Sequence, residues 1–208
     1  MAKQFKWVLG ASSVLILAPI LYAVQAYEAL PAQMAIHFNL QNQADQWVAK
    51  PLAVFGLPIF MLLLQWVCVG ISLIQQKGKP LAPRFERVVY SLIPILNVVV
   101  YVTMVSFNLG GKPDIRRIVL VLIGLVFIAI GNYLPTIPAT AQNRLHWPKQ
   151  PSQQLALRLN RRLGHYFVVA GVVLFGSLFF KPLVSALCLG GLLVGLVILL
   201  GRTVLTTN

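Results

Sequence analysis

The chain has 208 residues, of which 58% are hydrophobic and only 10% are charged, and its mean hydropathy is +0.81. Soluble domains carry about 25% charged residues, so this composition excludes an ordinary soluble globular protein and indicates a membrane protein. The formal net charge of +13 would suggest nucleic-acid binding in a soluble protein. Here the basic residues flank apolar runs, so membrane orientation and contact with anionic membrane lipids explain them better, and no direct binding of nucleic acid is expected.

Six apolar runs predict six transmembrane helices, because each approaches or exceeds the length that crosses a bilayer. The first run follows a basic start and ends near a small-residue site, as in a signal peptide, but it is longer than the roughly 7–15 apolar residues of secretory signals. We therefore expect an uncleaved helix, with cleavage of residues 1–26 as the alternative. The six predicted spans are residues 7–27, 51–75, 88–109, 118–134, 166–180 and 183–200.

The basic residues predict the orientation of these spans. With six spans both termini lie on one side, and that side holds twelve of the 17 Lys and Arg residues. The positive-inside rule then places both termini in the cytoplasm and the loop 28–50 outside, although three basic residues in the turn 110–117 argue against it. The predicted fold class is an all-α protein of the cytoplasmic membrane. It forms one membrane domain from two three-helix halves, residues 1–109 with the outer loop 28–50, and residues 110–208 with a basic cytoplasmic segment 136–165.

The outer loop concentrates the residues that chemistry or recognition could use. Residues 34–39 alternate weakly and predict a short extended segment, residues 41–43 predict a turn, and Asp45 is expected to cap a helix that begins near Gln46. The candidate recognition residues of this loop are His37, Asn39, Asp45, Trp47 and Lys50.

Two interpretations of His37 and Asp45 stay open. One side chain could orient the other in a recognition or proton-handling site. Alternatively, His37 is a hydrogen-bonded loop residue and Asp45 only a helix cap. Trp47 and Lys50 are residue types that favour the membrane–water interface.

The inner segment ends in a basic amphipathic pattern. Ser152 is a suitable helix N-cap, and leucines recur every four residues from Leu155. We expect a helix on the inner membrane surface, or else a docking site for a cytoplasmic partner. The expected contact residues are Arg144, Arg158, Arg161 and Arg162.

Inside the predicted spans the polar residues are uncharged amides. Such amides are more often hydrogen-bonding partners between helices than functional groups. No span carries a buried charge, which weakens the hypothesis of an ion-coupled transporter, and no metal, cofactor or catalytic motif is recognisable. We therefore predict a protein that is not an enzyme and needs no cofactor or metal. The amides are Gln65, Asn97, Asn108 and Asn132.

Two groups of residues resemble a known family. The outer-loop pattern is similar to the domain of unknown function that commonly precedes the SdpI module, although Asn42 or Gln43 stands where that domain usually has a glycine. The sequence Gly131-Asn132-Tyr133-Leu134-Pro135 resembles the start of the SdpI module itself, and the following segment departs from that module. The outer-loop pattern consists of Leu30-Pro31, Ile36-His37-Phe38-Asn39, Asp45-Gln46-Trp47 and Lys50.

The resemblance implies a bacterial membrane protein of immunity and signalling. Such proteins protect the cell from a secreted peptide toxin, and the best-known member also holds a cytoplasmic repressor at the membrane. The resemblance thus implies two partners, a toxin outside and a repressor inside. From the residues alone, two other hypotheses remain: a small transporter or lipid-handling protein, and an enzyme that uses His37 and Asp45.

Overall fold

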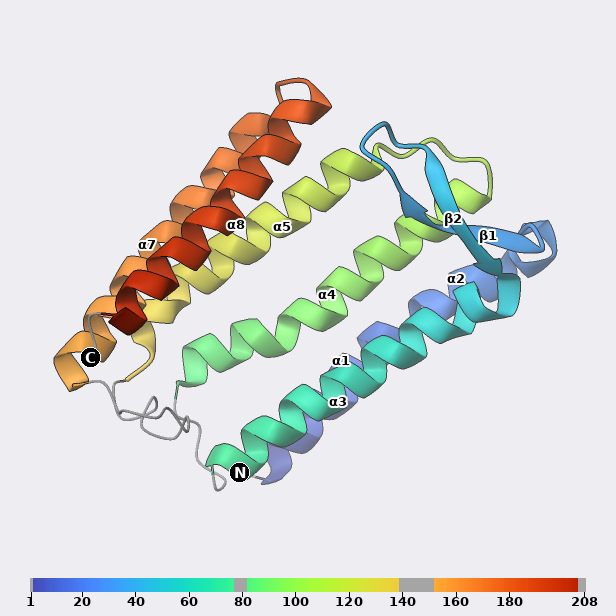
Figure 1. The fold of residues 1–208 in the computed structure, drawn as a ribbon. Helices are drawn as coiled ribbons and strands as arrows, with labels where there is room; N and C mark the ends of the chain where they lie inside the picture. The colour runs from blue at the N-terminus through green and yellow to red at the C-terminus, as the bar shows by residue number, and fades with distance from the viewer. Residues whose placement is uncertain (1, 77–81, 139–151, 206–208) are drawn as a thin grey trace. The chain divides into compact units, whose positions relative to one another are not determined.

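The computed structural model describes residues 2–76, 82–138 and 152–205, and these form helices apart from one two-stranded hairpin (Figure 1). In chain order the elements are α1 (Ala2–Leu17), α2 (Pro19–Gln25), η1 (Tyr27–Ala29), β1 (Gln33–Phe38), β2 (Ala44–Ala49), η2 (Leu52–Gly56), α3 (Leu57–Gln76), α4 (Pro83–Asn108), α5 (Ile115–Tyr133), η3 (Leu134–Thr136), α7 (Gln153–Ser177) and α8 (Pro182–Leu205).

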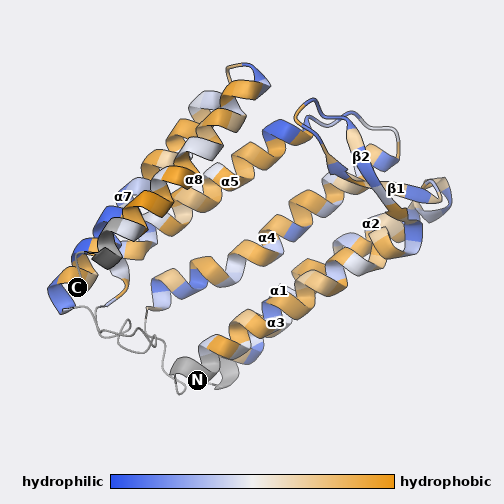
Figure 2. Cartoon of the chain, in the orientation of Figure 1, coloured by the Kyte–Doolittle hydropathy of each residue, from blue (hydrophilic) through white to orange (hydrophobic). Residues whose placement is uncertain are grey.

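The prediction of an all-α membrane protein is confirmed. Within the described ranges, five helical stretches are long and apolar enough to cross a bilayer. Figure 2 shows the hydrophobic residues running along the helices, whereas hydrophilic residues gather in the hairpin and in the first half of α7. The five stretches are Phe5–Gln25, Leu52–Ser72, Pro83–Asn108, Ile115–Thr136 and Pro182–Gly201.

The chain divides into two compact units, which are described separately. Unit 1 comprises Met1–Lys79 and Val89–Val119, and unit 2 comprises Pro80–Val88 and Leu120–Asn208. Unit 1 holds the hairpin. Its core lies where the hairpin meets α2, η2 and α4, and consists of Ala23, Leu30, Met34, Ala53, Val54, Tyr101, Met104 and Val105.

A buried tyrosine compensates for the proline near the start of α3. Pro58 has no N–H, so the carbonyl of Val54, four residues earlier, lacks its usual helical donor. The backbone just before Pro58 is a π-helix, η2, and the hydroxyl of Tyr101 donates to the Val54 carbonyl at 2.9 Å. This bond satisfies a backbone group that would otherwise be unpaired inside the membrane.

A side chain also donates to the carbonyl that lacks its usual helical donor because of Pro94, inside α4. Pro94 cannot donate to the carbonyl of Tyr90, and the side-chain amide of Gln65 on α3 donates to that carbonyl at 3.0 Å. At the break between α1 and α2, Asn97 on α4 donates to the carbonyl of Ile16 at 2.9 Å. Gln65 and Asn97 therefore act as the predicted links between helices, and they stabilise positions where helical hydrogen bonding fails.

Glycines set the packing of α5 against α7 in unit 2. A Cβ atom on Gly131 would lie 2.6 Å from the carbonyl oxygen of Gly164, and one on Gly171 would lie 2.6 Å from the carbonyl oxygen of Gly124. The two contacting glycines of α5 are seven residues apart, as are the two of α7, and this spacing is about two helical turns. The two antiparallel helices therefore approach backbone to backbone at two successive contacts, as small residues allow in membranes.

The predicted fifth span and the predicted surface helix are one continuous helix, α7. Ser152 caps it by accepting a hydrogen bond from the N–H of Leu155 at 3.3 Å, as predicted. The separation into two helices was wrong, because Gly164, the one residue that could have broken the helix, packs against Gly131 instead. Since the first half of α7 is basic, α7 is not among the five candidate spans, and the count of six spans stays a prediction.

Candidate functional site: a hairpin above an apolar cavity

Residues 40–42 form the turn of the hairpin, between the hydrogen-bonded residues Asn39 and Gln43. Asn42 adopts the left-handed backbone conformation in this turn. The N–H of Asn42 donates to the carbonyl of Asn39 at 3.1 Å, and the N–H of Asn39 donates to the carbonyl of Gln43 at 2.9 Å. Asn42 has φ of 60°, in the left-handed region that glycine and asparagine tolerate best. It is thus Asn42, and not Gln43, that occupies the position where a glycine is typical.

His37 and Asp45 form a direct pair across the two strands. His37 Nδ1 lies 2.5 Å from Asp45 Oδ1, and the side chains are 58% and 41% exposed. Two irregularities of the strand pairing flank His37, which stands opposite Gln46. Such bulges change the direction of side chains, and here they accompany the contact between imidazole and carboxylate.

The expected role of Asp45 as a helix cap was wrong. Asp45 lies inside β2, and the chain continues as a strand to Ala49. The helical backbone begins only at residue 50. Pairing with β1 outweighs the capping preference of Asp45, because β2 places Val48 against the core of unit 1.

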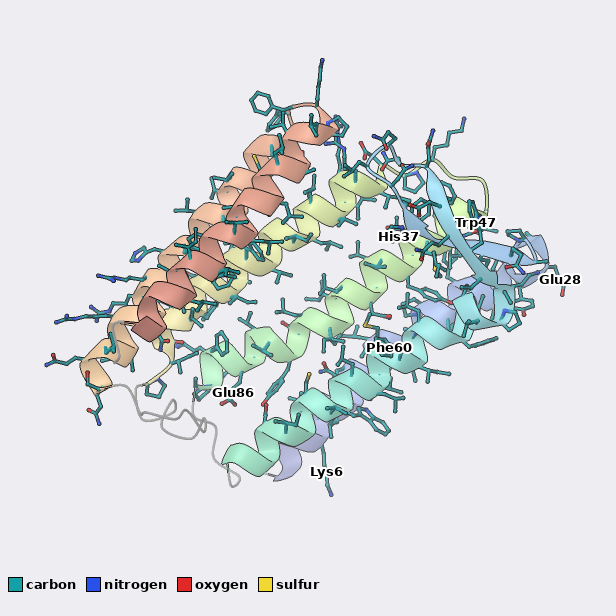
Figure 3. All side chains as sticks on the ribbon, in the orientation of Figure 1. Lys6, Glu28, His37, Trp47, Phe60 and Glu86 are labelled. Carbon is teal, nitrogen blue, oxygen red and sulfur yellow. The ribbon has the colours of Figure 1, made fainter. Side chains whose placement is uncertain are left out.

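The other predicted outer-loop residues lie along the same hairpin or directly after it. Trp47 is 54% exposed on β2, and Figure 3 shows it on the hairpin together with His37. The Asn39 side chain accepts from the N–H groups of Gln41 and Gln43 at 2.9 and 3.0 Å, so it holds the turn. Lys50 donates to the carbonyl of Tyr27 at 3.0 Å, and its ammonium lies 4.7 Å from the centre of the Tyr27 ring.

Asn108, at the end of α4, attaches β1 to the helices. Its Oδ1 accepts from the N–H of Ala35 at 2.8 Å, and its Nδ2 donates to the carbonyl of Ala35 at 3.0 Å. The amide thus pairs with both backbone groups of one strand residue, as a neighbouring strand would. Nδ2 also lies 2.8 Å from the carbonyl of Met104, which fixes the orientation of the amide.

Asn42 attaches the tip of the hairpin to the start of α5. Its Nδ2 donates to Asp114 Oδ1 at 2.9 Å, and its Oδ1 accepts from the N–H of Arg116 at 2.8 Å. Asp114 also accepts from the N–H of Arg117 and forms an ion pair with its guanidinium, both at 3.1 Å.

These contacts determine the direction in which the pKa of Asp114 is shifted. Partial burial by itself raises this pKa. The hydrogen bonds from Asn42 and from the N–H of Arg117, together with the charges of Arg116 and Arg117, outweigh it, so the pKa of Asp114 is lowered. The carboxylate that holds the hairpin tip is therefore stabilised in its ionised form.

A cavity of about 620 Å³ lies between the hairpin and the adjacent ends of α3, α4 and α5. Its volume falls in the range typical of small-molecule sites, roughly 300–1,000 Å³. Among the residues that the structure describes, only His37 and Thr103 line it with polar side chains, and the pair with Asp45 therefore lies at its hairpin end. The apolar lining is formed by Ile36, Phe38, Val48, Leu52, Ala53, Gly56, Leu57, Phe60, Val100, Met104, Ile115, Ile118 and Val119.

The predicted residues of the second half lie in unit 2. Gly131, Asn132 and Tyr133 end α5, whereas Leu134 and Pro135 belong to η3. Gly131 packs on α7, but Asn132 is exposed. The arginines Arg158, Arg161 and Arg162 are exposed on the first half of α7, and Arg144 lies outside the described residues.

Sequence analysis missed the residues that hold the hairpin in place. The contact of Asn42 with Asp114 and the contact of Asn108 with β1 were not predicted. Asp114 and Tyr101 were not singled out. A usable signal was present for Asp114, because it is one of only four acidic residues in the chain.

Comparison with known proteins identifies one matched region. A family model described as a domain of unknown function, DUF1648, matches residues 14–62. No curated protein and no solved structure matches the chain, and no match to the SdpI family itself was found. The matched region comprises the end of α1, the whole hairpin and the first turns of α3, so the chain is similar to this domain around its candidate site.

Proposed function

We propose that this protein binds a secreted, membrane-active peptide toxin at the hairpin and thereby gives the cell immunity, without catalysing a reaction. The observation that carries the proposal is the exposed pair of His37 and Asp45, which lies on the same hairpin as the exposed Trp47 and at one end of an apolar cavity. The exposed tryptophan on the same hairpin is a residue type that is enriched in binding hot spots. The resemblance to immunity proteins of the SdpI type supplies the class of ligand.

The energetics of the pair favour recognition over a role in stability. Exposed ion pairs contribute only about 0–1 kcal/mol to folding, and both side chains here are substantially exposed. The hairpin is held instead by Asn108 and Asn42. His37 and Asp45 are therefore free to change partners when a peptide arrives.

The proposal includes an orientation in the cytoplasmic membrane with the hairpin outside, following the distribution of basic residues. A cysteine introduced at Gln43, in a variant whose Cys68 and Cys188 are replaced by alanine, tests this orientation. A thiol reagent that cannot cross the membrane should label intact cells at this position. Labelling only after lysis would contradict the proposed orientation.

Survival of toxin-sensitive bacteria tests the immunity itself. Cells should express the wild type, His37→Ala, Asp45→Asn or Trp47→Ala at matched membrane levels, and be challenged with toxins of the cannibalism type. Gln46→Ala is the matched control, because Gln46 is exposed and lies between Asp45 and Trp47 on the same strand. We expect protection by the wild type and the control, and its loss in the three site variants.

Two outcomes would reject parts of the proposal. If the wild type fails to protect against several such toxins, the immunity function is wrong for that toxin class. If all three site variants protect as well as Gln46→Ala, immunity stands but the pair is not its recognition site.

The inner face carries a second part of the proposal. Arg158, Arg161 and Arg162 are exposed on α7, and we propose that they contact either anionic lipid or a cytoplasmic repressor. Replacing all three by glutamine should release such a repressor from isolated membranes. Membranes from these cells should otherwise contain normal amounts of the protein, and unchanged retention of the repressor would contradict this contact.

The alternative function is that of a small transporter or lipid-handling protein, and the apolar cavity is the feature that favours it. In this case the purified protein should transfer a lipid between the two leaflets of vesicles, or make that lipid accessible to a reagent outside them, with no toxin present. Immunity without such activity would favour the toxin-binding function.

A further inference from the structure

The position of the cavity along the candidate spans indicates that it lies at the depth of the bilayer hydrocarbon. Phe60 lies eight residues after the start of the span Leu52–Ser72, and Val100 lies eight residues before the end of the span Pro83–Asn108. At 1.5 Å per helical residue, the cavity extends about 12 Å from the ends of these spans. The hydrocarbon core of a bilayer is about 30 Å thick, so this depth reaches well into the hydrocarbon.

The cavity is only partly enclosed, and residues that line it at that depth are accessible. Phe60, Val100 and Val119 all line it and belong to three different candidate spans. Their exposed fractions are 59%, 39% and 40%. Around a membrane-spanning helix the medium in contact with these side chains is the acyl chains of lipid, and not water. The lining of the cavity is therefore continuous with the lipid-facing surface of unit 1.

The chemistry of the lining agrees with an amphiphile that enters from the bilayer. An apolar cavity of about 150 Å³ already stays free of water and binds apolar molecules, and this one measures about 620 Å³. Its polar groups, His37 and Thr103, lie toward the hairpin. His37 is on β1, and Thr103 is only five residues from the end of α4. This arrangement suits a molecule with its polar end at the hairpin and its hydrocarbon below.

We propose that the cavity beneath the hairpin binds one acyl chain of a membrane phospholipid, with the ester and head-group end of the lipid at His37. The hairpin closes this site on the side of the lipid head group. Asn108, and the contact of Asn42 with Asp114, hold the hairpin in this position above the acyl chain. This inference is independent of the immunity proposal, because the lipid site needs no toxin.

Photolabelling from the lipid tests the site. The purified full-length protein is reconstituted in vesicles of phosphatidylcholine and phosphatidylglycerol that contain a phosphatidylglycerol with a diazirine in one acyl chain. After illumination, adducts are located by mass spectrometry of peptides. Bulk lipid reaches the outer faces of the spans, but it reaches the inner face of the hairpin only through the cavity. Adducts on Phe38 or Val48, which line the cavity and are only partly exposed, are therefore diagnostic.

A pair of valines on α4 provides a matched comparison. Val100 and Val102 are both 39% exposed, but only Val100 lines the cavity. Val100→Phe should fill the cavity and reduce the hairpin adducts several-fold, whereas Val102→Phe should leave them at the wild-type level. Val119→Phe fills the cavity from α5 and should act like Val100→Phe, so the test does not depend on the folding of one variant.

Two results would overturn the lipid site. Equal hairpin adducts in Val100→Phe, Val119→Phe and Val102→Phe would mean that the lipid reaches the hairpin by another route. An unlabelled hairpin in the wild type would mean that no lipid acyl chain enters the cavity. The cavity would then bind a different ligand, such as an apolar peptide segment. Because no toxin is present, either result leaves the survival experiment unaffected.

Discussion

The side-chain amide of Asn42 lies 2.9 Å from the carboxylate of Asp114, although 72 residues separate the two in the chain. Asn42 therefore has two roles, since it also adopts the left-handed backbone of the hairpin turn. A glycine at this position would satisfy the turn as well, but it could not reach α5. The departure from the usual glycine thus gives this hairpin a contact that a glycine could not make.

The two roles of Asn42 can be separated by substitution. Asn42→Gly should keep the turn and lose the two side-chain hydrogen bonds. Asn42→Ala should lose these bonds and also strain the turn, because a left-handed residue with a Cβ costs about 1 kcal/mol or more. We expect limited proteolysis to cut the hairpin faster in Asn42→Gly than in the wild type, and fastest in Asn42→Ala. Gln41→Ala is the control for the turn, and equal rates in all three variants would disprove both roles.

The attachment of the hairpin tip should weaken in acid. Because the pKa of Asp114 is lowered from its ordinary value of 3.8 by its contacts, folding stabilises the ionised form. This stabilisation is complete well above pH 3.8, and it is lost as the pH falls below 3.8 and through the lower pKa of the folded state. Pepsin, which is active in acid, should therefore cut the hairpin increasingly fast over this range.

Asp114→Asn separates this effect from general acid unfolding. Its amide oxygen can still accept a hydrogen bond from Asn42, but it does not titrate. Cleavage of the hairpin in this variant should depend less on pH over the same range. The same acid dependence in the wild type and in Asp114→Asn would show that another group is responsible.

The hydroxyl of Tyr101 should contribute to stability because of Pro58. Tyr101→Phe leaves the buried carbonyl of Val54 without its donor, which costs about 1–3 kcal/mol. Pro58→Ala restores an N–H four residues after Val54, so the cost of Tyr101→Phe should fall in the Pro58→Ala background. A double-mutant cycle of unfolding in detergent micelles measures this coupling.

The control for this cycle is Tyr133→Phe, which removes a hydroxyl at the end of α5. It should change the free energy of unfolding little, and equally in both backgrounds. Additive effects of Tyr101→Phe and Pro58→Ala would contradict the compensation that we infer between the tyrosine and the proline.

The sequence predicted the helices of this protein well, because their signal is strong and local. Long apolar runs reveal spans whatever their neighbours. The helices α3, α4, α5 and α8 coincide with four predicted spans, with ends that differ by one to six residues. The break between α1 and α2 at Pro19 was not predicted. A proline inside an apolar run shows where a helix can break. It does not show whether a neighbouring helix will donate to a carbonyl at the break, as Asn97 does to Ile16.

The site was harder to predict, because its geometry depends on distant residues. The contact of His37 with Asp45 was part of one of two interpretations, and it appears only because Asp45 lies in the strand β2. The role of this pair in recognition stays a prediction. The hairpin shape rests on Asn108 and Asp114, which contact residues 72 or 73 positions away. No local pattern contains such contacts.

Replacing a glycine by alanine should lower the free energy of unfolding at Gly131 of α5, but not at Gly190 of α8. In Gly131→Ala the new methyl group would lie 2.6 Å from the carbonyl oxygen of Gly164 and 2.8 Å from the backbone nitrogen of Val168. Backbone atoms cannot move aside as a flexible side chain can, so α7 must shift, and such overpacking costs about 1–3 kcal/mol. Gly190→Ala places its methyl group where nothing lies within 4 Å, and alanine favours a helix over glycine by about 0.5–1 kcal/mol. Unfolding in detergent micelles should therefore show Gly131→Ala destabilised and Gly190→Ala unchanged or stabilised. If both variants lose the same stability, the close contact between α5 and α7 does not determine the packing of unit 2.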